Sequence, residues 1–135
     1  MALQFSTSVR NGQLDGTETT IGTSAIIRIR TGSVPANCAA ADSGTVLATI
    51  TCPSDWMAAA SGGTKDKLGT WTDSSADATG TAAHFRIYDS TGTTCHIQGT
   101  VTATGGGGDL TVDNTSFATG QSFTINTFTW TAGGA

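Results

Sequence analysis

The sequence predicts an all-β domain: an antiparallel β-sandwich, with jelly-roll connections as one solution, a short N-terminal helix and one helical turn near residues 54–60. Threonine, which favours strands, makes up about a fifth of the chain. Two runs of alternating apolar and polar residues, 84–88 and 95–103, flank a glycine-containing turn. No strand-then-helix alternation suggests parallel units, so two stacked antiparallel sheets are the economical solution.

Length and charge limit what the chain can be. Its 135 residues and 13.6 kDa allow one domain, and 12% of the residues are charged against about 25% in an average soluble domain. No run of 18 apolar residues could form a membrane helix, so we expect no membrane partner. The net charge is −4, with the acidic surplus in the second half of the chain. A protein that contacts phosphates would show a basic surplus, so we expect no direct nucleic-acid binding.

The N-terminal part, residues 1–24, is predicted as an extended arm followed by a weak helix. Residues 3–6 alternate apolar and polar side chains, and apolar spacing favours a helix from Ser8 to Ile21, capped by Ser8. Gly12 and Gly16 disfavour this helix by about 1 kcal/mol each relative to Ala, with a hairpin turn around Gly12 as the alternative. Residues 25–135 are predicted as a single β-sandwich domain.

Alternation predicts the first strands of that domain. Residues 25–30 form a strand with Ile27 and Ile29 on one face and Arg28 and Arg30 on the other. After a loop over 31–43, a second strand covers residues 46–52. A capped helical turn then follows at 54–60, and a third strand is expected at 68–72. The sequence Lys65-Asp66-Lys67, between the helical turn and the third strand, is interpreted as a solvated turn.

The hairpin of residues 84–103 carries the strongest pattern. If Phe85, Ile87, Cys95 and Ile97 share the buried face, Arg86 and His96 share the exposed one. A short strand at 110–112 follows the glycine-rich link 105–108. The closing strand, 121–131, changes phase near 126–127, which indicates a bulge or a bend that carries the chain from one sheet to another.

No residue constellation indicates catalysis, so we expect no enzyme, cofactor or metal. The run Gly105–Gly108 lacks the Lys-Ser/Thr of a phosphate loop, and both histidines are predicted at the surface. The three cysteines form no CxxC pair and are interpreted as small buried hydrophobes. The large aromatic side chains could form a glycan platform, but a domain this small needs them in its core; they are Trp56, Trp71, Trp130, Phe85, Phe123 and Phe128.

Several stretches resemble short structural proteins of tailed bacteriophages and prophages. Among them are PANCAAAD at 35–42 and PSDWMAAA at 53–60; the others are 9–11, 21–24, 29–32, 80–89 and 99–109. In that family, helix-favouring residues such as Ala are expected in place of Gly12 and Gly16. The resemblance spans nearly the whole chain, and none of these stretches is a catalytic motif.

The resemblance implies a non-enzymatic virion component, above all a capsid decoration or cement protein on the outside of the shell. Its partners would be the major capsid protein or other virion subunits, including further copies of itself. Since no signal peptide is evident, we expect synthesis in the host cytoplasm and residence in the virion. A tail, collar or head–tail connector subunit is the alternative, and a receptor- or glycan-binding module is another. The contact residues expected from their position outside the predicted core are Leu3, Phe5, Arg10, Arg28 and Arg30.

Overall fold

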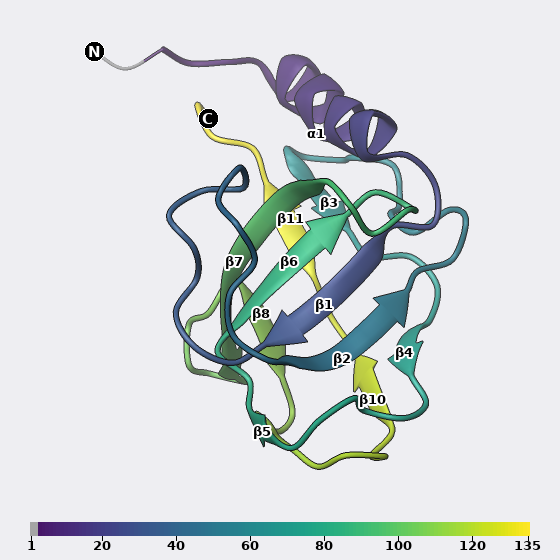
Figure 1. Cartoon of the computed structure of the whole chain (residues 1–135). Coiled ribbons are helices and arrows are strands. Elements are labelled where there is room, and N and C mark those ends of the chain that lie inside the picture. The colour runs from purple at the N-terminus through teal and green to yellow at the C-terminus, as the bar shows by residue number, and fades with distance from the viewer. Residues whose placement is uncertain (1–2) are drawn as a thin grey trace.

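The computed structural model describes residues 3–135, which form mainly strands with one N-terminal helix, α1 (Thr7–Ile21) (Figure 1). The first two residues of the predicted arm lie outside this range. The described strands are β1 (Ile26–Arg30), β2 (Val46–Thr51), β3 (Thr64–Asp66), β4 (Trp71–Asp73), β5 (Gly80–Thr81), β6 (His84–Tyr88), β7 (Cys95–Ala103), β8 (Leu110–Val112), β9 (Ser116–Phe117), β10 (Phe123–Ile125) and β11 (Thr129–Thr131).

The main sheet has the strand order β2-β1-β6-β7-β8 and curls into a half-barrel (Figure 1). Three of its pairings are antiparallel, whereas β7 and β8 run parallel. This parallel pair forms because the chain reverses twice between residues 103 and 110, where Gly105 and Gly107 adopt positive φ angles of 88° and 80°. The predicted β character and N-terminal helix are confirmed, but the mixed, curled sheet does not clearly form a sandwich or jelly-roll.

The remaining strands form three two-stranded ladders, β10-β4, β11-β3 and β5-β9. The predicted closing strand is therefore two strands: β10 pairs with β4, and β11 pairs with β3. The change of phase near residues 126–127 marks this transfer from one ladder to another, as the sequence indicated. The predicted third strand is shifted, since β4 begins at Trp71.

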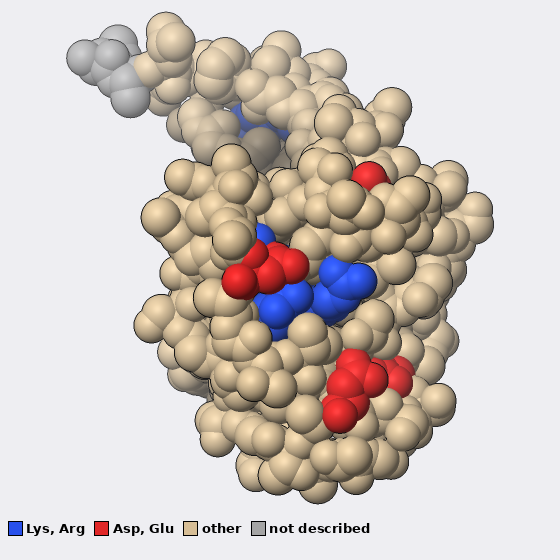
Figure 2. All heavy atoms as spheres, viewed as in Figure 1, with Lys and Arg blue, Asp and Glu red and all other residues tan. Residues whose placement is uncertain are grey.

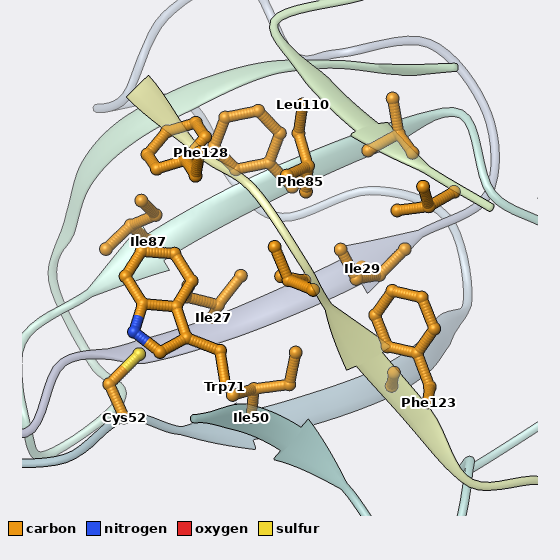
Figure 3. Close-up of a cluster of buried hydrophobic side chains, with 14 of the residues drawn as sticks. Ile27, Ile29, Ile50, Cys52, Trp71, Phe85, Ile87, Leu110, Phe123 and Phe128 are labelled. Carbon is orange, nitrogen blue, oxygen red and sulfur yellow. The ribbon is translucent and has the colours of Figure 1, made fainter. Parts of the chain in front are cut away.

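The core fills the concave side of the main sheet. Figure 3 shows Ile27 and Ile29 of β1 and Ile87 of β6 pointing toward Trp71 and Phe128 from the smaller ladders and their connections. All five side chains are buried. The burial of these apolar side chains is the main stabilising term of the fold, since each Å² of apolar surface removed from water contributes about 25 cal/mol.

The large aromatic side chains pack against one another in this core, as predicted for them, with Trp130 only partly buried. The Trp56 and Trp71 centroids are 5.8 Å apart, and Trp130 stands edge-on to Trp56 at 5.5 Å. Phe128 stands edge-on to Phe85 at 5.6 Å. Trp130 is partly buried and packs against the cluster, while the other four rings are buried.

Two predictions for residues 54–67 are wrong. Residues 54–60 form no helical turn, because the backbone there pairs with the β3 segment: Met57 bridges Lys67, and the Ala58 N–H donates to Asp66 O at 2.9 Å. The expected solvated turn at Lys65 is strand β3, with the Lys65 side chain buried. Its ammonium is compensated by two carboxylates of α1, which no local pattern at Lys65 could reveal.

Candidate interaction surfaces

The N-terminal arm is the first candidate surface. It projects from the start of α1, near the C-terminus (Figure 1). The Phe5 N–H donates to Gly134 O at 2.6 Å, so the arm is held against the C-terminal segment at that point. Leu3 is 79% exposed, Phe5 40% and Val9, in the first turn of α1, 47%. Three exposed apolar side chains within seven residues are the kind of feature that marks a binding surface.

The N-cap of helix α1 lies two residues before the predicted one, Ser8. Ser6, in an extended conformation, is the N-cap, and its Oγ accepts from the Val9 N–H at 3.2 Å. Gly12 and Gly16 lie inside the helix on its exposed side. The helix is therefore confirmed over the alternative hairpin, and contacts with the body of the protein offset the weak helix propensity of these glycines.

A buried lysine joins α1 to the body. The Lys65 ammonium of β3 lies 2.6 Å from Asp15 Oδ1 and 2.7 Å from Glu18 Oε2, and it donates to Ala58 O at 2.9 Å. Burial disfavours the charged amine, but the two carboxylates outweigh this effect and raise the pKa of Lys65. The hydrogen bonds from Lys65 and from the Ala60 N–H lower the pKa of Asp15.

Further contacts extend this attachment along one face of the helix. At its N-terminal end the Arg10 guanidinium donates to Ala132 O at 3.1 and 3.3 Å, while Asn11 Oδ1 accepts from the Gly63 N–H at 2.8 Å. At its C-terminal end the Trp56 indole N–H donates to Gly22 O at 2.9 Å. Helix α1 buries Leu14 and Ile21 but docks mainly through polar groups, so the apolar spacing of its sequence is weak.

The second candidate surface lies on the convex side of the main sheet and contains three arginines. Arg28 and Arg30 of β1 stand beside Arg86 of β6, with Arg28 directly opposite Arg86 in the ladder. Figure 2 shows basic atoms gathered in a hollow on this side, with acidic groups nearby. Neighbouring like charges are unfavourable unless compensated, and Asp42, in the loop that follows β1, forms ion pairs with Arg30 and Arg86.

The Asp42 carboxylate connects two members of this arginine cluster, Arg30 and Arg86. Its Oδ1 accepts from Arg86 Nη1 and from the Tyr88 hydroxyl, each at 2.6 Å, and its Oδ2 accepts from Arg30 Nη2 at 3.1 Å. Burial opposes ionisation, but these hydrogen bonds and the charge of Arg30 outweigh it and lower the pKa of Asp42. Burial and the hydrogen bond to Asp42 raise the pKa of Tyr88.

Arg86 also fastens the loop itself to the sheet. Its guanidinium donates to the carbonyls of Asn37 and Ala40, at 2.9 and 3.0 Å, and to Gln98 Oε1 at 2.9 and 3.1 Å. Only 2% of the Arg86 residue is exposed, so the prediction that it faces solvent is wrong. The loop covers it, and this cover could not be inferred from strand alternation.

An irregular register explains the other errors in the hairpin. Ile87 pairs with Ile97, but Tyr88 pairs with Cys95, so His96 occupies a bulge. Cys95 therefore lies on the arginine side of the sheet instead of sharing the buried face of Ile87. His96 lines a hollow beside α1.

His84 is fully buried, which overturns its predicted surface position. Its Nδ1 lies 2.8 Å from Gly32 O, an acceptor, so the hydrogen bond assigns the proton to Nδ1. Within residues 3–135 no group of three or more His, Cys, Asp or Glu side chains is arranged to hold a metal ion. No helix in that range is both long and apolar enough to cross a membrane.

Of the five predicted contact residues, the two apolar ones are exposed and the three arginines are engaged in contacts within the chain. Leu3 and Phe5 are exposed on the arm, whereas Arg10 holds the base of α1 against the C-terminal segment. Arg28 donates to Gly92 O at 2.9 Å and lies over the Tyr88 ring, and Arg30 is only 7% exposed. Sequence reasoning missed Asp42 and Lys65, the residues that organise the two surfaces, because their partners are distant in sequence.

Comparisons of the chain with models of known protein families, with curated proteins and with solved structures find no match.

Proposed function

We propose that this chain is a non-enzymatic structural subunit of a virion: a capsid decoration or cement protein that binds the outside of the shell. Its partners are the major capsid protein and neighbouring copies of itself. The observation that carries the proposal is the projecting arm, in which Leu3 is 79% and Phe5 40% exposed. The resemblance to short phage structural proteins supplies the biological setting.

The rest of the structure is compatible with this role. The polar contacts of Arg10, Asp15 and Glu18 hold α1 on the body, so the base of the arm is fixed while its apolar side chains remain exposed. A fixed base reduces the entropy lost when such an arm binds a neighbouring subunit. Many copies on one shell would make individually weak contacts effective through avidity.

The arm is tested by its occupancy on particles. The double variant Leu3→Ser/Phe5→Ser removes the two exposed apolar side chains that precede α1 without touching the α1 contacts. We expect its occupancy on capsids to fall by about tenfold or more. Leu68→Ser is the matched control, because Leu68 is 41% exposed and lies outside the arm. Unchanged occupancy of the double variant would refute the role of the arm.

Imaging of intact particles tests the position of the subunit. Many copies distributed over the outer shell are the expected result. A small ring at the tail or head–tail junction would instead support the connector alternative, and absence from the particle would overturn the virion assignment.

A further inference from the structure

Two cysteines far apart in the sequence meet beside the arginine cluster. Cys38 lies in the loop after β1 and Cys95 is the first residue of β7, and both line an open hollow of about 540 Å³. After burial, the neighbouring Cys38 thiol is the next largest cause of the raised pKa of Cys95, in keeping with two thiols on the wall of one hollow. Each residue is partly exposed and carries a free thiol, so small molecules can reach the pair.

The surrounding contacts keep these thiols together. Arg86 holds the loop over the sheet through the Asn37 and Ala40 carbonyls, and its Nη2 lies 3.5 Å from Cys38 O. On the strand side, the register that pairs Cys95 with Tyr88 turns it toward this loop. The Cys95 thiol donates to Ile97 O at 3.4 Å. The two sulfurs are thus placed by separate elements that Arg86 fastens to each other.

We propose that Cys38 and Cys95 are a redox-sensitive pair, which a small-molecule disulfide converts to an intramolecular disulfide that ties the loop to β7. Excess small-molecule thiol reverses the step. This inference concerns the thiols of the folded chain and does not depend on the proposed function.

The exchange proceeds in two steps. The Cys38 thiolate attacks one sulfur of the small disulfide, forms a mixed disulfide and releases one thiolate. The Cys95 thiol then loses its proton to solvent and attacks the Cys38 sulfur, which releases the second small thiol. The protein loses two electrons and two protons, and the small disulfide gains them as two thiols. Cys38 is assigned the first attack because burial and the neighbouring Cys38 raise the pKa of Cys95 to about 12.

Cys52 provides an internal control. It lies in the hydrophobic core, 3% exposed, and burial raises its pKa to about 12. A buried thiol of this kind reacts slowly with disulfides. Unspecific oxidation would modify exposed cysteines separately, whereas the proposed chemistry joins Cys38 to Cys95 in one crosslink.

The test uses the purified full chain, incubated with oxidised glutathione and then denatured, alkylated with a maleimide and weighed by mass spectrometry. The wild type should retain one alkylated thiol, with a Cys38–Cys95 crosslink in the peptide map. The Cys52→Ser variant should form the same crosslink and retain none. The Cys38→Ser and Cys95→Ser variants should form no intramolecular disulfide and at most glutathione adducts.

Thermal unfolding provides a second readout. A disulfide across this separation restricts the unfolded chain, so oxidation should raise the Tm of the wild type and of Cys52→Ser by about 10 °C. Cys38→Ser should show no such shift. Three alkylatable thiols in the oxidised wild type, glutathione adducts without the crosslink, or a crosslink that involves Cys52 would each overturn the proposal.

Discussion

Replacing Arg86 by Met should destabilise the protein by about 3–5 kcal/mol, a large part of the 5–15 kcal/mol typical of a domain. The methionine keeps most of the side-chain volume but removes every guanidinium donor. Gln98 Oε1 and the carbonyls of Asn37 and Ala40 lose their bonds to Arg86, and Asp42 loses its contact at 2.6 Å. Each buried acceptor left without a donor costs about 1–3 kcal/mol, reduced where water can enter the open hollow.

Urea unfolding measures the loss of stability, and hydrogen exchange over residues 31–45 measures the release of the loop. Arg86→Lys retains the charge but offers fewer donors, so it should fall between the wild type and Arg86→Met. Arg28→Met is the matched control: Arg28 makes one hydrogen bond, to Gly92 O, and stacks on Tyr88, so its loss should cost about 1 kcal/mol. A loss below 1 kcal/mol for Arg86→Met, with unchanged exchange in the loop, would refute this reasoning.

Five other substitutions test the helix, its attachment and the loop between β1 and β2. Gly12→Ala and Gly16→Ala should each raise the free energy of unfolding by about 0.5–1 kcal/mol in thermal melts, because a Cβ at either site meets no atom within 4 Å. Gly44→Ala should lower the free energy of unfolding, since φ is 72° there and the new Cβ would collide with the Thr31 carbonyl. Lys65→Met should lower it by about 1–3 kcal/mol and weaken hydrogen-exchange protection in α1, and intact protection would contradict the anchor. Because the pKa of Asp15 is lowered, Asp15 contributes stability that is present above its ordinary value of 3.8 and is lost as the pH falls through the lower folded-state pKa. In urea melts across this pH range, the free energy of unfolding of Asp15→Asn should depend less steeply on pH than that of the wild type. An unchanged pH dependence would contradict the linkage.

Strands could be predicted wherever local alternation determined burial. Ile27 and Ile29 of β1, Ala48 and Ile50 of β2, and Phe85 and Ile87 of β6 are buried in the core as their spacing indicated. The phase change near residues 126–127 also identified the transfer between ladders. Strand β3 was missed because its burial depends on carboxylates from α1, and residues 54–60 resembled a helix because the pairing that extends them is not visible locally.

The candidate surfaces could be predicted only in part. Leu3 and Phe5 are apolar residues outside any periodic element, and their exposure follows from that pattern. The arginine cluster behaves differently, because the loop of Asp42 folds over it and turns an apparent solvent face into a buried network. The bulge at His96 then moves Cys95 beside that loop, since one additional residue in a strand changes which side chains share a face.

The central claim, that this chain is a subunit on the outside of a capsid shell, is tested most directly by cryo-electron microscopy of intact particles. The account predicts density for this fold at many equivalent shell positions, with the arm of Leu3 and Phe5 in contact with a neighbouring subunit. Particles that lack the chain, or shells in which the arm touches no neighbour, would contradict it.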